Sequence, residues 1–213
     1  MSIDFSPRKK PSQKRSIHTV EAIFEACIQV LLATGLERLT TTKVADRAGV
    51  SVGTLYQYFP NKESLLSAVL QNYLGAVISE VEAACVAGKG QALDAMAGLV
   101  VKGFLAAKMR NQDVSKALYA VSSDVGGADI VARMTQRAQL ALCGMLATAP
   151  DARFEDLSIL SYVLTTALVS PVQGLVVSGA SAATVQAVER HLVLLVQAYL
   201  NRLQKRTEEE PRQ

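Results

Sequence analysis

The sequence predicts an all-α protein of about nine helices. Its Ala- and Leu-rich segments carry apolar residues at helical spacing and lack the sustained alternation of a half-buried strand. Glycines and prolines, such as Gly35, Gly49, Pro60 and Pro150, separate these segments. Half of the 213 residues are hydrophobic, which is enough for a substantial core and excludes a chain that is disordered throughout.

The first third of the chain carries the excess positive charge. Residues 1–65 hold nine Lys or Arg against six Asp or Glu, which equals the net charge of +3 of the whole chain. Five of these cations lie between Arg8 and Arg15 without an acid. We expect residues 1–15 to form a basic flexible arm along DNA phosphates, with a solvated tail as the alternative. The charge therefore predicts an anionic partner at one end of the molecule.

The first three helices are expected over residues 16–34, 41–48 and 52–59. Between the two short ones, Gly49 is suited to the positive φ that ends a helix. Ser51 is suited to cap the next helix through its hydroxyl. Two short helices around a glycine turn form a helix-turn-helix.

The second short helix has an inward and an outward face when about 100° is assigned to each residue. Leu55 and Phe59 lie inward. The outward residues are small, polar or amphipathic and suit the major groove of DNA, where Gln57 can pair with adenine. The outward set is Gly53, Thr54, Gln57 and Tyr58, with Val52 and Tyr56 at its flanks.

The segment from Leu39 to Leu65, which includes AGVSVGTLYQYFPNK, resembles the DNA-binding domain of TetR-family transcriptional regulators. The resemblance implies a DNA-binding domain over residues 16–62 and a helical domain over 63–206 that binds an effector and dimerises. At position 52 relatives often have a basic or polar residue, whereas Val52 leaves only an apolar contact to a thymine methyl. The DNA contacts implied by the resemblance are Thr41, Ser51, Val52, Gly53, Thr54, Tyr56, Gln57, Tyr58 and Lys62.

Six further helices follow from the pattern of apolar residues and breakers. Asn61 is a plausible N-cap for a long helix that ends near Val86. The others are expected over residues 91–109, 113–122, 128–148, 153–178 and 182–206, and a disordered tail over 207–213.

Residues 157–188 contain no charged residue and are long enough to span a bilayer. Their many Ser and Thr residues and the lack of flanking Lys or Arg clusters favour a helix buried in a protein interface instead. We therefore expect no membrane partner and a homodimer of the four-helix type. The expected interface residues are Leu160, Leu164, Val185, Val188, Leu192, Leu195 and Tyr199.

The helical domain also offers candidates for a pocket that would hold a small apolar or amphipathic effector. Ordinary core packing is the alternative role for each of these residues. The candidates are Phe104, Met109, Tyr119, Met134, Met145, Tyr162 and Thr166.

No pattern in the sequence predicts a metal, a cofactor or catalysis. Cys27, Cys85 and Cys143 lack metal-site spacing and are expected to be reduced, and no secretory signal opens the chain, so a cytoplasmic location is expected. Residues 49–53 match G-x-S-x-G formally, but the hydrolase elbow needs a preceding strand. We therefore expect a repressor that binds a near-palindromic operator and is released by an effector. The alternative is a constitutive DNA-binding regulator or an activator without a ligand.

Overall fold

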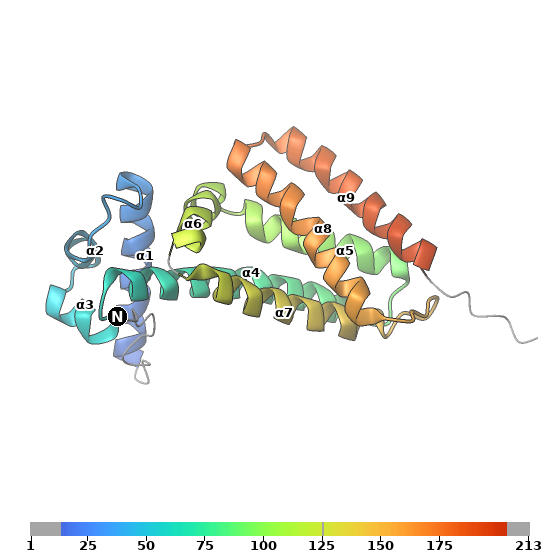
Figure 1. Ribbon diagram of the computed structural model, residues 1–213, viewed down its shortest axis with the longest axis horizontal. Coiled ribbons are helices and arrows are strands. Elements are labelled where there is room, and N and C mark those ends of the chain that lie inside the picture. Colours follow the sequence, from blue (N-terminus) through green and yellow to red (C-terminus); the bar gives the residue numbers. More distant parts are fainter. Residues whose placement is uncertain (1–13, 125, 204–213) are drawn as a thin grey trace, which may run out of the picture. The chain divides into compact units, whose positions relative to one another are not determined.

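The computed structural model describes residues 14–124 and 126–203, and within them it contains nine helices (Figure 1). They are α1 (Lys14–Thr34), α2 (Thr41–Ala48), α3 (Val52–Tyr58), α4 (Lys62–Gly88), α5 (Leu93–Met109), α6 (Gln112–Asp124), α7 (Gly127–Leu146), α8 (Leu157–Ser178) and α9 (Ala182–Leu203).

The all-α class and the number of helices are confirmed, and most helix ends fall within a few residues of the expected ones. Helix α1 begins at Lys14, so the last two residues of the expected arm are helical. Helix α8 begins four residues later than expected, because the Asp156 carboxylate accepts the N–H groups of Ser158 and Ile159 and so caps it there. Most of the expected arm, and the tail over 207–213, lie outside the described residues.

The chain forms two compact units, which we call unit 1 and unit 2. Unit 1 contains the described residues up to Gly75 together with residues 113–132, and unit 2 contains residues 76–112 and 133–203. Helices α4 and α7 each contribute residues to both units. Unit 1 thus extends beyond the domain end expected at residue 62.

Unit 1 is held together by one apolar cluster. Ile23 of α1, Leu55 of α3 and the loop residue Phe59 lie at its centre, and each is almost fully buried. Val114 and Leu118 of α6 belong to the same cluster as the first half of α4. Because the helix-turn-helix shares its core with these two helices, the compact unit is larger than the sequence suggests.

Unit 2 is built on α5, which contacts both α8 and α9. The Asp151 carboxylate accepts the N–H of Leu93 at 3.1 Å and so satisfies a free donor at the start of α5. At the next residue of α5, the Asp94 carboxylate accepts a hydrogen bond from the Asn201 side-chain amide of α9 at 3.0 Å. Helix α5 also lies close to α4, where a Cβ on Gly103 would come within 3.0 Å of the Ala84 methyl group.

Two described helical segments, Ser16–Thr34 and Leu157–Ser178, are long and apolar enough to cross a membrane. Both also contribute residues to the cores just described, since Ile23 and Cys27 of α1 and Leu164 and Leu168 of α8 are buried. Core helices of proteins without a membrane segment have the same length and composition.

Candidate nucleic-acid interface and ligand cavity

The turn between α2 and α3 has the geometry of a helix-turn-helix. Gly49 has φ 68°, the left-handed conformation that a residue with a Cβ adopts only at a cost. The N–H of Val50 donates to the Ala45 carbonyl at 3.0 Å, which satisfies one of the free acceptors at the end of α2. At the start of α3, the Thr54 N–H donates to the Ser51 hydroxyl at 3.0 Å. The expected stop at Gly49 and the expected cap at Ser51 are both confirmed.

Helix α3 lies with one face against the core and the other in solvent. Leu55 and Phe59, the residue directly after α3, are buried, and the Phe59 ring packs on Phe24 of α1 at a centroid distance of 5.8 Å. Gly53 and Gln57 are exposed, and the Gln57 amide makes no hydrogen bond within the part of the chain that the structure describes. A free amide on a short exposed helix can form the bidentate contact that adenine offers in the major groove.

The remaining candidate contacts differ in exposure. Ser51 and Tyr56 are exposed, whereas Val52 and Thr54 are half-buried. Tyr58 is also half-buried and packs against the core, although the helical pattern had placed it outward. The short α3 ends at Tyr58, where the chain turns toward Pro60, so this side chain is directed back to the core.

Thr41, one of the DNA contacts that the resemblance implies, is buried rather than exposed. Only 8% of the Thr41 surface is exposed, and the Thr41 hydroxyl lies 2.9 Å from the Tyr56 hydroxyl. The pair links the start of α2 to the exposed side of α3. Thr41 therefore holds Tyr56 in position, while the Tyr56 ring, 40% exposed, remains accessible.

Lys62 is also engaged within unit 1. Its ammonium group donates to the Leu36 carbonyl at 2.8 Å, which ties the start of α4 to the loop after α1. Asn61 caps this helix as expected, since its side chain accepts the Ser64 N–H at 2.7 Å.

Three basic side chains that we had not assigned to the site lie near it in unit 1. Arg38, Lys43 and Arg47 are exposed, and they donate hydrogen bonds to neutral oxygen atoms of Thr34, Arg38 and Gln29, respectively. Within the described residues none of the three forms an ion pair with a carboxylate. Their positive charge is therefore available to phosphate groups. Their count was visible in the sequence, but their position around the turn was not.

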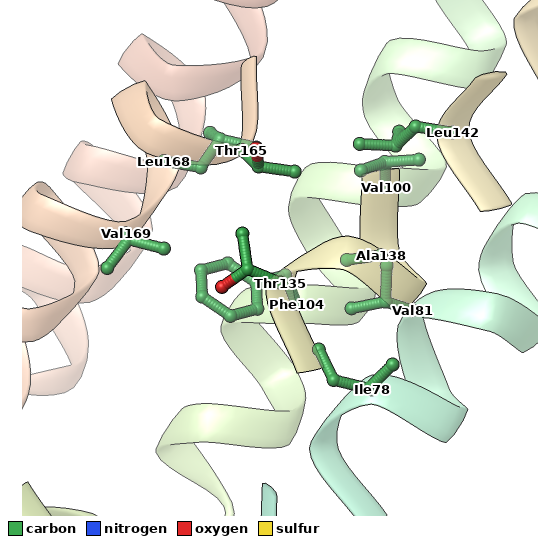
Figure 2. Close-up of a pocket in the computed structure, with 10 residues that line it drawn as sticks. All are labelled: Ile78, Val81, Val100, Phe104, Thr135, Ala138, Leu142, Thr165, Leu168 and Val169. Atoms are coloured by element: carbon green, nitrogen blue, oxygen red, sulfur yellow. The ribbon is translucent and has the colours of Figure 1, made fainter. Parts of the chain in front are cut away.

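Unit 2 contains an apolar cavity of about 60 Å³ between α4, α5, α7 and α8 (Figure 2). Among the residues that the structure describes, its only polar lining side chains are Thr135 and Thr165, and no charged side chain lines it. The lining residues are Ile78, Val81, Val100, Phe104, Thr135, Ala138, Leu142, Thr165, Leu168 and Val169.

Of the expected effector-pocket residues, Phe104 lines this cavity. Tyr162 and Thr166 are exposed on α8, because a rotation of about 100° per residue places them opposite the buried Leu164 and Leu168. The other four residues lie elsewhere. Met145 lines a second cavity of about 10 Å³, Met134 and Met109 lie outside both linings, and Tyr119 belongs to unit 1.

The expected dimer residues also divide between two environments. Leu160, Leu164 and Leu192 are buried within the chain and are not available to a partner. Val185, Val188 and Tyr199 are half-buried, and Leu195 is exposed. The expectation for the three leucines is wrong because the apolar residues of α8 and α9 occupy two faces of these helices. The three leucines lie on the face that packs on α5.

The second apolar face of α8 and α9 is exposed, and we call it the α8/α9 face. On α8, Ile159, Tyr162 and Val163 are three or four positions apart, and Val177 follows Ile159 by 18 positions, which is about five helical turns, so the four lie in one row. Helix α9 adds two adjacent exposed leucines. The members of the face are Ile159, Tyr162, Val163, Val177, Leu194 and Leu195.

Family models match both parts of the chain. The model described as "Bacterial regulatory proteins, tetR family" matches residues 23–69, and the model described as "Tetracyclin repressor-like, C-terminal domain" matches residues 92–200, just over half of the chain. The chain belongs to the TetR family. The first match contains the complete helix-turn-helix, and the second spans α5 to α9 except the last residues of α9.

Among curated TetR relatives, the Fatty acid metabolism regulator protein of Bacillus subtilis is 35% identical over 60 residues, which are 28% of this chain and 31% of the relative. The first three curated relatives are matched over only 31% to 39% of their own length.

Solved structures of the TetR family share the fold over most of the chain. A protein assigned to the TetR-family regulators of Mesorhizobium loti has a TM-score of 0.75 at 17% identity, with 89% of this chain and 98% of that one covered. FadR of Bacillus subtilis, solved with stearoyl-CoA, has a TM-score of 0.67 at 18% identity, with 84% of this chain and 97% of that one covered. At these identities the likeness shows the fold alone.

Proposed function

We propose that this TetR-family regulator is a repressor that binds a near-palindromic DNA operator as a homodimer and is released by a small apolar or amphipathic effector. The observation that carries the proposal is the exposed polar side of α3, where Gln57 forms no hydrogen bond within the described residues, together with Arg38, Lys43 and Arg47, which form no ion pair there.

In the proposed complex, α3 of each subunit enters the major groove of one half-site. Gln57 contacts a base edge, and Gly53 allows the phosphate backbone or a base to approach α3 closely. Lys43 and Arg47 contribute phosphate contacts, which give affinity but no sequence preference. The exposed ring of Tyr56, which precedes Gln57, is held by the contact between its hydroxyl and that of Thr41 and can also contact the DNA.

In the proposed dimer, the α8/α9 faces of two copies cover each other. A four-helix arrangement of this kind buries the exposed apolar row of α8 together with Leu194 and Leu195 of α9. The absence of any charged residue between Leu157 and Ser178 supports this, since interface centres are depleted in charge.

The effector is proposed to enter the cavity of unit 2 and to favour a conformation that binds DNA less well. The apolar lining supports an apolar ligand. The FadR structure contains stearoyl-CoA, whose long acyl chain supports, by analogy, an effector with an extended apolar part. Linkage then requires that DNA also weaken effector binding.

The DNA half of this proposal is tested by selecting bound fragments from a random double-stranded library with the purified protein. We expect an enriched sequence with two inverted half-sites, because a symmetric dimer presents two copies of α3. Enrichment of no sequence above the unselected library at physiological salt would refute operator recognition.

A second candidate function is regulation without a ligand, either as a constitutive repressor or as an activator. It is favoured by the cavity volume of about 60 Å³, which is far below the roughly 300–1,000 Å³ of typical ligand sites. Titration of apolar compounds into the complex with selected DNA separates the two functions. Release of DNA by a saturable compound supports the effector-controlled form.

A further inference from the structure

The cavity of unit 2 has an exposed end and a buried end. Val169 is exposed and Phe104 and Thr135 are half-buried, so solvent reaches the cavity from their side. Val100 and Leu142 are buried at the other end. Figure 2 shows this division, with Val169, Phe104 and Thr135 toward the left and Val100 and Leu142 at the upper right.

The two hydroxyl groups in the lining differ in what they can still bind. The Thr165 hydroxyl donates to a backbone carbonyl of its own helix at 2.9 Å and accepts from the Gln139 amide at 3.2 Å. The Thr135 hydroxyl has no hydrogen-bond partner within the described residues. Thr135 is therefore the side chain in the lining whose hydrogen-bonding capacity is open to a ligand.

The buried end continues toward a second apolar cavity. Val100, Leu142 and Leu168 line both cavities, and beyond them the second is lined by Met96, Met145 and further aliphatic residues. Methionine side chains adjust easily because they are unbranched and flexible. A narrow apolar chain can therefore extend from the first cavity past the shared side chains into the second, where the two methionine side chains can shift to make room.

A charged ligand group would find no partner in this cavity. Two arginines of unit 2, Arg110 and Arg137, already form ion pairs with Glu80 and Glu82. Lys108 follows Phe104 by one turn of α5 but is not part of the lining and has a partner of its own. A carboxylate placed among the apolar side chains would remain unpaired, which is strongly unfavourable.

From these observations we infer that the cavity binds a neutral, elongated apolar molecule with one hydrogen-bonding head group, which contacts the Thr135 hydroxyl while the apolar chain extends past Val100 and Leu142. The inference rests on the proposed function, of which it specifies the effector. It distinguishes this chain from a regulator that recognises an acyl-CoA or a free fatty acid through its charge.

The test compares ligands of one chain length and different head groups. Binding of 1-decanol, decanoate, decanoyl-CoA and decyltrimethylammonium to the DNA-free protein is measured by calorimetry, with 1-hexanol to 1-dodecanol as a length series. We expect at least one alcohol in the series to bind, and decanol to bind at least about tenfold more tightly than any charged ligand. Tighter binding of decanoate or decanoyl-CoA, or no binding by any alcohol, would overturn the inference.

Two threonine variants locate the head group. Thr135→Val keeps the side-chain volume and removes the hydroxyl, so alcohol affinity should fall about 3- to 10-fold. Thr166→Val alters an exposed threonine of α8 outside the cavity and should leave the affinity unchanged. Equal affinities of both variants and the unmodified protein would overturn the assignment to Thr135, and circular dichroism establishes that each variant is folded.

Because these measurements use no DNA, their outcome does not depend on whether the protein recognises an operator. A protein that binds decanol but enriches no DNA sequence retains the cavity assignment and loses the operator. A protein that enriches an operator and prefers decanoate retains the regulator and loses the neutral effector.

Discussion

Gly49 is the residue on which the shape of the helix-turn-helix depends most directly. Its φ of 68° ends α2 and directs the chain into α3. A Cβ at this position would meet no atom within 4 Å, so the cost of a side chain is conformational rather than steric.

Gly49→Ala is therefore expected to lower the free energy of unfolding by about 1 kcal/mol. Gly75→Ala is the matched control, because Gly75 lies inside α4 at ordinary φ with open space around its Cβ. This second change should raise stability by roughly 0.5–1 kcal/mol through helix propensity. Urea denaturation followed by circular dichroism measures both, and a destabilisation by Gly75→Ala as large as that by Gly49→Ala would contradict the explanation.

Lys108 gives unit 2 a specific dependence on pH. Burial lowers the pKa of its ammonium group to about 8 from 10.5. Between these values the folded chain has released the proton while the unfolded chain still holds it. The unfolded state then binds more protons, so the contribution of Lys108 to the free energy of unfolding rises with pH from about 8 to 10.5.

As the pH rises through this window, the free energy of unfolding of the unmodified protein should increase relative to that of Lys108→Met by up to about 2 kcal/mol. The comparison is needed because burial also raises the pKa of Cys27 to about 12 and of Tyr119 to about 12, and these groups titrate in both proteins. Lys102→Met, an exposed position on the same helix, should show no such shift. Parallel pH profiles for Lys108→Met and the unmodified protein would rule the effect out.

Among the elements, α3 combines a buried inner side with an exposed outer side on which Gly53 and Gln57 make no packing contact that the fold requires. Gly53 illustrates the separation, since a Cβ there would meet only the Ser51 hydroxyl oxygen at 3.7 Å, an ordinary contact. Its place on the exposed side is explained by close approach of DNA rather than by packing.

Gly53→Ala should therefore leave the fold intact, or stabilise α3 by up to about 1 kcal/mol, and still weaken operator binding by roughly tenfold. Thermal unfolding and fluorescence anisotropy with the selected operator measure the two quantities on the same samples. A variant that binds the operator as tightly as the unmodified protein would mean that DNA does not approach α3 at this residue.

Helices α8 and α9 show why elements were easier to predict than sites. Spacing of apolar residues indicates where a helix lies, and caps such as Ser51 and Asn61 indicate where it begins. Helices that are apolar on two sides do not reveal from sequence which side packs inward, so Leu164 was assigned to the dimer while Tyr162 was assigned to the pocket.

In the candidate site, the features that depend on local contacts were predicted, whereas those that depend on contacts distant in the sequence were not. The exposed position of Gln57 follows from the short helix alone, whereas the burial of Thr41 depends on Tyr56, fifteen residues away. The cavity needs four helices to meet, and only Phe104 among the expected residues lies on the side of its helix that faces the cavity. Choosing methionines and tyrosines by type did not identify that side.

At the scale of the whole molecule, the proposed function requires two copies. Leu194→Glu places a charge on the α8/α9 face at a residue that is 60% exposed, so it should not disturb the single chain but should convert the dimer to a monomer. Leu140→Glu is the matched control, a leucine of unit 2 that is 65% exposed on α7 outside that face. Light scattering coupled to size-exclusion chromatography measures the mass, and a dimeric Leu194→Glu protein would place the interface elsewhere.

The most direct test of operator reading by α3 is the affinity of Gln57→Ala for the selected operator at fixed salt, measured by fluorescence anisotropy. The loss of a bidentate base contact should weaken binding by about 1–3 kcal/mol, while Gln71→Ala, which removes an exposed glutamine of α4, should bind normally. Binding to unrelated DNA should change little for either variant. If Gln57→Ala binds the operator as tightly as Gln71→Ala does, α3 does not read the sequence through this residue and the proposed recognition is wrong.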